Sequence, residues 1–117
     1  MENNFTLNLV DIIDKRETAL VGREHGEETL RQLKLNKFIL KNLEEKYDHI
    51  IIEIPKKIIT MNKSFFLGLF ETRVQEMGKE NFKDKYIFKT SDHIITKINK
   101  HIDAALLNAT QKEILND

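Results

Sequence analysis

The sequence predicts a small α/β domain in which helices pack on a mixed sheet of about four strands. Residues 50–54 are isoleucines interrupted only by Glu53, which is typical of a central strand covered on both faces. Residues 5–10 and 85–90 alternate between apolar and polar side chains, the period of half-buried strands. At 117 residues the chain has the length of one domain, so we expect a single domain over residues 1–117.

The first half of the chain is expected to hold two strands and a broken helix. The apolar stretch 18–21 follows the first strand closely enough to pair with it as a hairpin. Gly22 and Gly26 leave the backbone free to turn, and a helix is predicted over residues 27–46. The apolar residues of this helix lie on two stripes, so we expect a break or kink near residues 35–36.

A strongly apolar helix is predicted over residues 64–77, after a connection at residues 55–63. The apolar arc of this helix is about 200° wide, whereas a helix resting on a sheet needs little more than about 100°. We therefore expect Phe65, Leu67 or both to contact something besides their own sheet. Gly68 is expected on the side of the helix opposite the sheet, toward solvent, where a glycine would also fit close approach by another backbone.

The last third of the chain is predicted to hold a loop, a strand and the most regular helix. Gly78 ends the preceding helix, and residues 79–84 form the loop. Ser91 or Asp92 then caps the final helix. Its apolar residues form one stripe, made of Ile94, Ile95, Ile98, Ile102, Ala105, Leu106 and Ala109.

The end of the chain departs from that stripe. Leu107, Ile114 and Leu115 fall beside it. We expect these residues in a frayed tail over residues 110–117 or at an interface. They permit a homodimer without requiring one.

The composition excludes several classes of function. The absence of Cys excludes a disulfide framework and a thiolate metal site, in agreement with a reducing compartment. Nineteen basic and nineteen acidic residues cancel, so the basic footprint of a nucleic-acid-binding protein is missing at the level of the whole chain. The N-terminal segment has no basic region, and no window reaches the length of a membrane span. We expect a cytoplasmic protein that binds neither membrane nor nucleic acid.

No motif in the sequence points to an enzyme, a cofactor or a metal. The four histidines lack metal-ligand spacing, and the chain has no phosphate-binding glycine loop and no HExxH motif. Arg23, Glu24 and His25 lie between two glycines, where no nucleophile and base can be paired, so we interpret them as a surface turn. We therefore predict a non-enzymatic protein without catalytic residues, metal or cofactor.

Ser64 opens the apolar helix and has two interpretations. As the N-cap it would accept hydrogen bonds from the amides of Phe66 or Leu67, and replacing it by Ala would cost roughly 1 kcal/mol. As a phosphorylation site it would add about −1.5 to −2 charges at a helix N-terminus, which tolerates anions. Thr60 is a second candidate phosphorylation site.

Glu53 lies at the point where its strand meets the connection, on the face opposite Ile52 and Ile54. One interpretation is that its carboxylate binds loop amides or a nearby lysine. The other is a ligand crevice at the carboxyl end of the strand, the usual binding site of open α/β sheets. Arg23 and His25 are the other candidate residues of that crevice.

Four stretches of the chain resemble a known family. They are residues 23–26, 50–54, 60–70 and 81–106, which are distributed over most of the chain, from residue 23 to residue 106. They are similar to the bacterial and phage STAS-like family of unknown function, and more distantly to the STAS domains of anti-sigma-factor antagonists. The predicted order strand, strand, helix, strand, helix, strand, helix is also similar to that of STAS domains, and the resemblance implies the same fold. It also implies a protein partner, for example an ATP-binding regulatory kinase, and switching by phosphate or by competition.

We therefore expect a regulatory protein-protein interaction module that uses residues 55–63 and the start of the helix at 64–77. The expected contact residues are Asn62, Lys63, Ser64, Phe65, Gly68 and Thr72. In a phage, the same surface would instead inhibit a host protein. The alternative function is a small-ligand or nucleotide sensor that uses the crevice beside residues 50–54.

Overall fold

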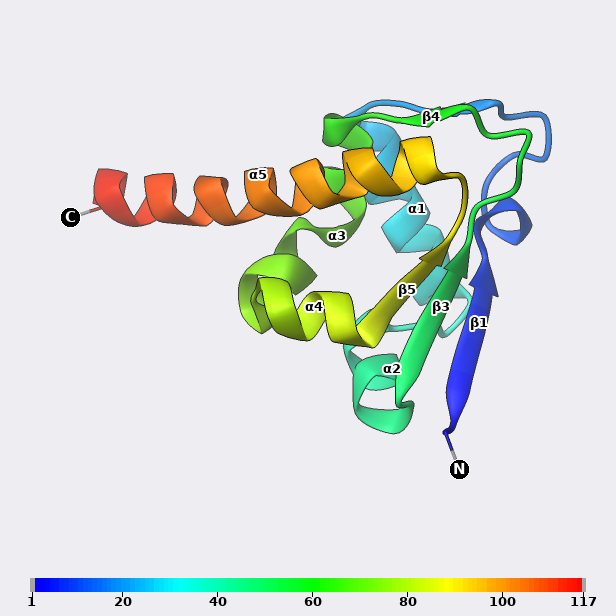
Figure 1. The fold of residues 1–117 in the computed structure, drawn as a ribbon, viewed down its shortest axis with the longest axis horizontal. Coiled ribbons are helices and arrows are strands. Elements are labelled where there is room, and N and C mark those ends of the chain that lie inside the picture. Colours follow the sequence, from blue (N-terminus) through cyan, green and yellow to red (C-terminus); the bar gives the residue numbers. More distant parts are fainter. Residues whose placement is uncertain (1, 117) are drawn as a thin grey trace.

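A three-stranded parallel sheet forms one layer of the fold (Figure 1). The computed structural model describes residues 2–116, with side chains described as far as Gln111. The strands are β1 (Asn4–Asn8), β3 (His49–Glu53) and β5 (Tyr86–Lys89), and β3 lies in the middle. The prediction that residues 50–54 form the central strand is thus confirmed.

The helices pack against one face of this sheet. Among the described residues they are α1 (Arg23–Leu35), α2 (Leu40–Lys46), α3 (Lys63–Met77), α4 (Lys79–Lys85), α5 (Asp92–Asn116) and the short 3-10 helix η1 (Leu9–Asp11). The strand order β1-β3-β5 means that both crossovers run in the same direction. Because crossovers between parallel strands are right-handed, their helices arrive on the same side of the sheet.

No helix of the described residues covers the other face of the sheet. Ile50 and Ile52 are 0% exposed, whereas Ile51 between them is only half-buried. Ile87, the neighbour of Ile51 on β5, is 39% exposed. The expectation of a strand covered on both faces is therefore wrong, because both crossovers place their helices on one side.

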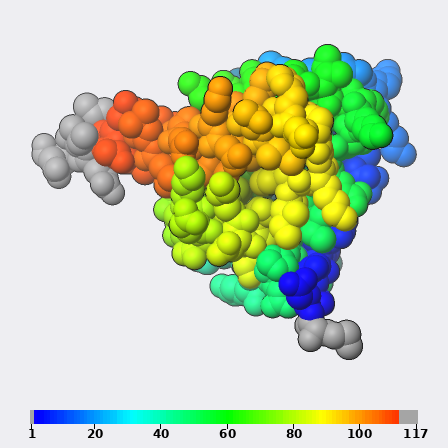
Figure 2. All heavy atoms as spheres, viewed as in Figure 1, coloured from blue at the N-terminus to red at the C-terminus, as the bar shows by residue number. Residues whose placement is uncertain are grey.

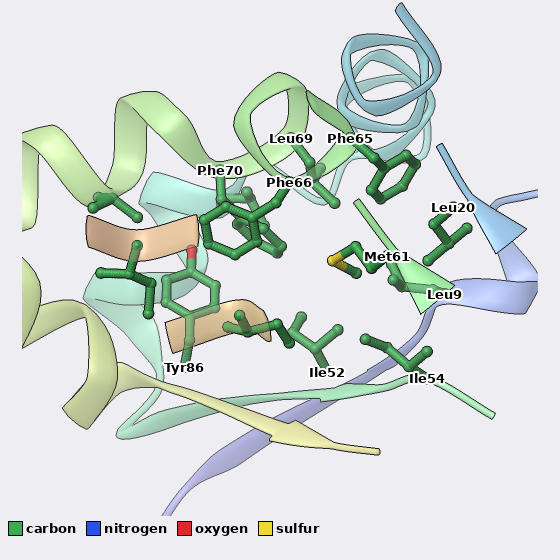
Figure 3. Close-up of a cluster of buried hydrophobic side chains, with 14 of the residues drawn as sticks. Leu9, Leu20, Ile52, Ile54, Met61, Phe65, Phe66, Leu69, Phe70 and Tyr86 are labelled. Atoms are coloured by element: carbon green, nitrogen blue, oxygen red, sulfur yellow. The ribbon is translucent and has the colours of Figure 1, made fainter. Parts of the chain in front are cut away.

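The core lies between the sheet and α3. Figure 3 shows Ile52 and Tyr86 of the sheet pointing toward Phe66 and Phe70 of α3. The Phe66 and Phe70 ring centroids are 5.3 Å apart, and the Phe82 ring of α4 stacks on Tyr86 at 4.6 Å. Each buried Phe side chain contributes roughly 1.5–3 kcal/mol by leaving water, so these rings hold α3, α4 and β5 together.

A second parallel pair, β2 (Ala19–Leu20) and β4 (Thr60–Met61), closes the other end of the core. Leu20 and Met61 lie opposite each other and are both 0% exposed. Burial of this pair joins residues 18–21 to β4, so the predicted hairpin with the first strand is wrong. The described sheets have three and two parallel strands, rather than the four mixed strands that we expected.

The ends of α1 agree only in part with the sequence. The helix ends at Leu35, which confirms the predicted break. It begins at Arg23 rather than at residue 27, because Gly22, with a φ of 97°, is its N-cap and the turn is complete before Gly26. A left-handed backbone of this kind suits glycine because it has no Cβ.

The end of α3 and the start of α5 lie at the residues that the sequence predicted. Gly78, with a φ of 82°, ends α3 as predicted. The Ser91 hydroxyl accepts a hydrogen bond from the Ile94 N–H at 3.3 Å, which confirms the predicted start of α5. The prediction of a loop at residues 79–84 is wrong, because α4 forms there and buries Phe82 completely.

The last helix continues beyond its apolar stripe. Its backbone is described as far as Asn116, and Leu107 is 57% exposed. The side chains of Ile114 and Leu115, which we expected in a tail or an interface, lie outside the described residues.

Candidate functional site

The apolar arc of α3 is covered by α1 of the same chain. Phe65 is 0% exposed and Leu67 is 6% exposed. The two helices cross closely: a Cβ on Gly68 would lie 2.3 Å from the Arg23 carbonyl oxygen, and one on Gly26 would lie 2.2 Å from the Phe65 carbonyl oxygen. The expectation that Gly68 faces solvent is wrong. The apolar side chains of α3 that do not face the sheet are buried against other parts of the same chain.

This crossing changes the set of predicted contact residues. Phe65 and Gly68 lie under α1 and present no surface to a partner. The remaining four keep some exposure: Asn62 and Ser64 are half-buried, while Lys63 and Thr72 are exposed.

Asn62 caps α3. Its Oδ1 accepts hydrogen bonds from the N–H of Phe65 at 3.0 Å and from the N–H of Gly22 at 3.2 Å. One side chain thus satisfies a free amide of α3 and also joins the starts of α1 and α3. The interpretation of Ser64 as the N-cap is wrong, since Ser64 is already the second helical residue. Asn and Ser are equally good caps, so residue type alone could not separate them.

The connection from β3 to α3 follows a fixed course over the surface. Ile58 is 2% exposed and belongs to the core, whereas the adjacent Ile59 is 68% exposed. The Ile59 N–H donates to the Thr18 carbonyl at 2.8 Å, and the Lys57 ammonium group donates to the Lys15 carbonyl. The connection therefore presents one exposed aliphatic side chain from an ordered backbone.

Lysines accompany this isoleucine along the connection. Lys56, Lys57 and Lys63 are all exposed. Residues 54–63 include no acidic residue, although the whole chain has as many acidic as basic residues. We call residues 55–63 the connection surface. Its charge is complementary to an acidic partner.

A hollow of about 520 Å³ lies at the carboxyl ends of the parallel strands. Its lining residues come from the ends of β1, β3 and β5 and the segments that follow them: Asn8, Glu53, Ile54, Pro55, Lys56, Lys89, Thr90 and Ser91. Glu53 is the register partner of Lys89. The first turn of α5 begins beside the hollow, so backbone amides and two lysines lie near one another there. Such a site suits an anionic ligand.

The other two predicted crevice residues lie against α3 instead. The Arg23 guanidinium is 3.4 Å from the Glu71 carboxylate. The His25 ring meets the Phe65 ring edge-on at 5.0 Å. Among the described residues, no hydrogen bond or ion pair links Arg23 or His25 to Glu53, so the structure does not bring this predicted trio together.

A buried polar cluster that the sequence did not reveal joins α2, α3 and β5. The Tyr86 hydroxyl donates to Glu44 Oε2 at 2.6 Å, and Arg73 Nε donates to the same oxygen at 2.8 Å. Arg73 also donates to Glu44 Oε1 and to Glu76. No spacing rule connects residues so far apart in the chain, and Glu44 looks like any charged helical residue.

Tyr86 and Arg73 both stay protonated at neutral pH. Burial, together with the hydrogen bond to Glu44, raises the pKa of Tyr86 well above its ordinary value. The hydrogen bonds that Arg73 donates to Glu44 raise the pKa of Arg73 further above its already high value. Both groups therefore keep their protons, and we interpret the cluster as structural rather than as acid-base machinery.

His101 of α5 is a second buried polar residue, 8% exposed. Its Nε2 lies 3.0 Å from the Met61 carbonyl oxygen, so Nε2 carries the proton and donates. Burial lowers the pKa of His101, and the charges of Lys97 and Lys63 lower it further. The neutral ring thus links α5 to the edge of β4.

The described part of the chain holds no group of three or more His, Cys, Asp or Glu side chains that could bind a metal ion. No helix within it is both long and apolar enough to cross a membrane. Comparison of the chain with protein-family models, curated proteins and solved structures gave no significant match.

Proposed function

We propose that this chain is a non-enzymatic, STAS-like regulatory module that binds an acidic protein partner through the connection surface and the start of α3. The observation that carries the proposal is Ile59, which is 68% exposed on a segment held by hydrogen bonds. The resemblance to STAS-like proteins favours an ATP-binding regulatory kinase as the partner. In a phage-encoded chain, the same surface would bind a host protein.

The anatomy of the surface supports this proposal. Binding interfaces commonly place an apolar contact at the centre and polar or charged residues at the rim. Ile59 would fill an apolar pocket of the partner, while Lys56 and Lys57 would attract its acidic groups. Because the connection is already ordered, binding would cost little conformational entropy. Lys63, in the first turn of α3, extends the surface, whereas Thr72 is exposed about two and a half turns further along the helix and on its opposite side.

Ile59→Asp tests the proposal, and Leu35→Asp is its matched control because both wild-type side chains are 68% exposed. The partner is captured by cross-linking to the wild-type chain, purified, and titrated with each variant. We expect Ile59→Asp to raise the Kd at least about tenfold, as loss of a central apolar contact does. Leu35→Asp should leave the Kd within about twofold of wild type.

A folding control and a contradicting outcome complete this experiment. Thermal unfolding should show the same Tm for both variants, because neither side chain contributes to the core. Equal affinities of the two variants for the captured partner would contradict the proposed surface.

Phosphorylation is the regulatory step that the proposal includes. Ser64 is partly exposed beside Lys63 in the first turn of α3, where a phosphate is tolerated electrostatically. The Thr60 hydroxyl accepts a hydrogen bond from Lys97 at 3.2 Å, so a phosphate on Thr60 would lie beside that ammonium group. Either modification would reduce the positive charge of the connection surface and weaken its attraction for an acidic partner.

A second candidate function is a nucleotide or small-anion sensor, and the hollow at the carboxyl ends of the strands favours it. Lys56, Lys89 and the first turn of α5 would bind the phosphates. A nucleotide series in a thermal-shift assay separates this function from partner binding, because a ligand of the folded state raises Tm with concentration. The gain should disappear in Lys89→Gln. It should remain in Ile59→Asp.

A further inference from the structure

The outer edge of β5 carries unpaired backbone groups. β5 is an edge strand whose only described neighbour is β3. The Ile54 N–H donates to the Lys89 carbonyl at 3.0 Å, so Lys89 points its backbone groups toward β3. Successive residues of a strand point these groups to opposite sides. The N–H and C=O of Phe88 therefore point outward, away from the sheet.

An apolar hollow of about 150 Å³ lies beside this edge, between β5, α4 and α5. Figure 2 shows the surface hollowed between the yellow-green α4, the yellow β5 and the orange α5. Its apolar lining consists of Phe82, Tyr86, Phe88, Ile95, Ile98 and Ile102. The floor of the hollow is buried, since Ile98 is 2% exposed and Ile102 is 1% exposed. Phe88 and Ile95 are half-buried and form the mouth.

The size of the hollow and the charge beside it limit which side chains can bind there. A space of about 150 Å³ holds one small aromatic ring, and thus one Phe or Leu side chain. Lys83 lines the hollow and is exposed, and no described residue forms an ion pair with it. If the apolar side chain of a bound peptide entered the hollow, an acidic residue next to it in the peptide would therefore lie near the ammonium group of Lys83.

We propose that the groove between β5 and α5 binds an extended acidic peptide, whose backbone pairs with Phe88 and whose central apolar side chain enters the hollow. Strand addition of this kind obtains affinity from main-chain hydrogen bonds and specificity from a side-chain pocket. None of these residues lies on the connection surface. The inference goes beyond the proposed function and does not depend on it.

The probe is the acetylated, amidated pentapeptide Glu-Val-Phe-Val-Glu, titrated into the full chain with detection by NMR and calorimetry. We expect saturable binding that shifts the backbone amide of Phe88. Replacing the central Phe of the peptide by Asp should weaken binding at least about tenfold, because the hollow is apolar. N-methylation of both valines should weaken it to a similar extent, because it removes the donors of the added strand.

Variants of the protein localise the site. Ile95→Trp should close the mouth and lower the affinity at least about tenfold, as blockage of a side-chain pocket does. The matched control is Ile87→Trp on the same strand, which faces the open side of the sheet and should leave affinity within about twofold. Lys83→Glu should weaken binding of the acidic peptide and strengthen binding of Lys-Val-Phe-Val-Lys.

Three results would overturn the inference. The first is equal binding of the N-methylated peptide, since the peptide would then not add as a strand. The second is binding of toluene in the hollow without any binding of the peptide, which would indicate a small-molecule site. The third is a concentration-dependent dimer that Ile95→Trp converts to a monomer, because the occupant would then be a second copy of the chain.

Discussion

Glu44 is the residue on which the buried polar cluster depends. Its carboxylate accepts hydrogen bonds from Arg73 and from Tyr86, so one side chain satisfies donors on two other elements. The Glu44 and Arg73 side chains are only 7% and 13% exposed. A buried ion pair adds little net stability, but removing one partner leaves the other charge buried without compensation.

Glu44→Gln is therefore expected to destabilise the protein strongly. Breaking a buried ion pair costs roughly 3–5 kcal/mol, and we expect the lower end because Arg73 keeps Glu76 as a partner. Urea unfolding of wild type and variant measures the difference.

Glu45→Gln is the matched control for this residue, because Glu45 is exposed. It should change the free energy of unfolding by no more than about 0.5 kcal/mol. Adding Arg73→Met to Glu44→Gln should recover part of the loss, because the uncompensated charge is removed. Equal unfolding free energies for Glu44→Gln and Glu45→Gln would contradict a structural role for the cluster.

At the scale of elements, the crossing of α1 over α3 decides which surfaces the protein exposes. Gly26 and Gly68 allow the two backbones to meet without intervening side chains. The groups that a Cβ would strike are backbone atoms, which cannot rotate away as a side chain can. The close contact buries Phe65 completely and removes it from any interface.

We predict that Gly26→Ala or Gly68→Ala destabilises the protein by about 2 kcal/mol. Overpacking costs roughly 1–3 kcal/mol, and we expect the high end because the helices themselves must separate. The gain of about 1 kcal/mol in helix propensity offsets part of this cost. Thermal or urea unfolding measures the net effect.

Glu27→Ala is the control in the same helix, since Glu27 is exposed. It should stay within about 0.5 kcal/mol of wild type. Stabilisation by Gly26→Ala would show that the helices do not approach as closely as described.

For the whole molecule, the dependence of stability on pH below about 7 should reflect His101. Burial lowers the pKa of this ring in the folded chain, and Lys97 and Lys63 add to the effect. In the unfolded chain its pKa returns to about 6.5. The unfolded chain therefore takes up a proton that the folded chain does not, in the range between the folded and unfolded pKa values.

The free energy of unfolding should thus fall as the pH falls from about 7 toward the folded-state pKa of His101, by at most about 1.4 kcal/mol per pH unit. His101→Gln should flatten this dependence, because Gln stays neutral and still offers a donor to the Met61 carbonyl. His93→Gln, which replaces an exposed histidine of the same helix, should keep the wild-type slope. Identical slopes for both variants would contradict this assignment.

Local features of the sequence were sufficient to predict several elements of this fold. The isoleucine run of β3, the break after Leu35, the stop at Gly78 and the cap at Ser91 all depend on residues within one or two turns of each other. Backbone sterics and capping act over that range. The predictions based on them hold to within a residue or two.

What covers each surface was decided only by the tertiary structure. Residues 18–21 pair with β4, not with the first strand, and Phe65 packs under α1. The Glu44 cluster and the hollow beside β5 likewise join segments distant in sequence. These choices depend on total burial and hydrogen bonding between distant segments, for which no local pattern exists. The sequence by itself determined the position of β3, the C-terminal ends of α1 and α3 and the start of α5, whereas only the tertiary structure decided that α3 is covered and that β5 keeps a free edge.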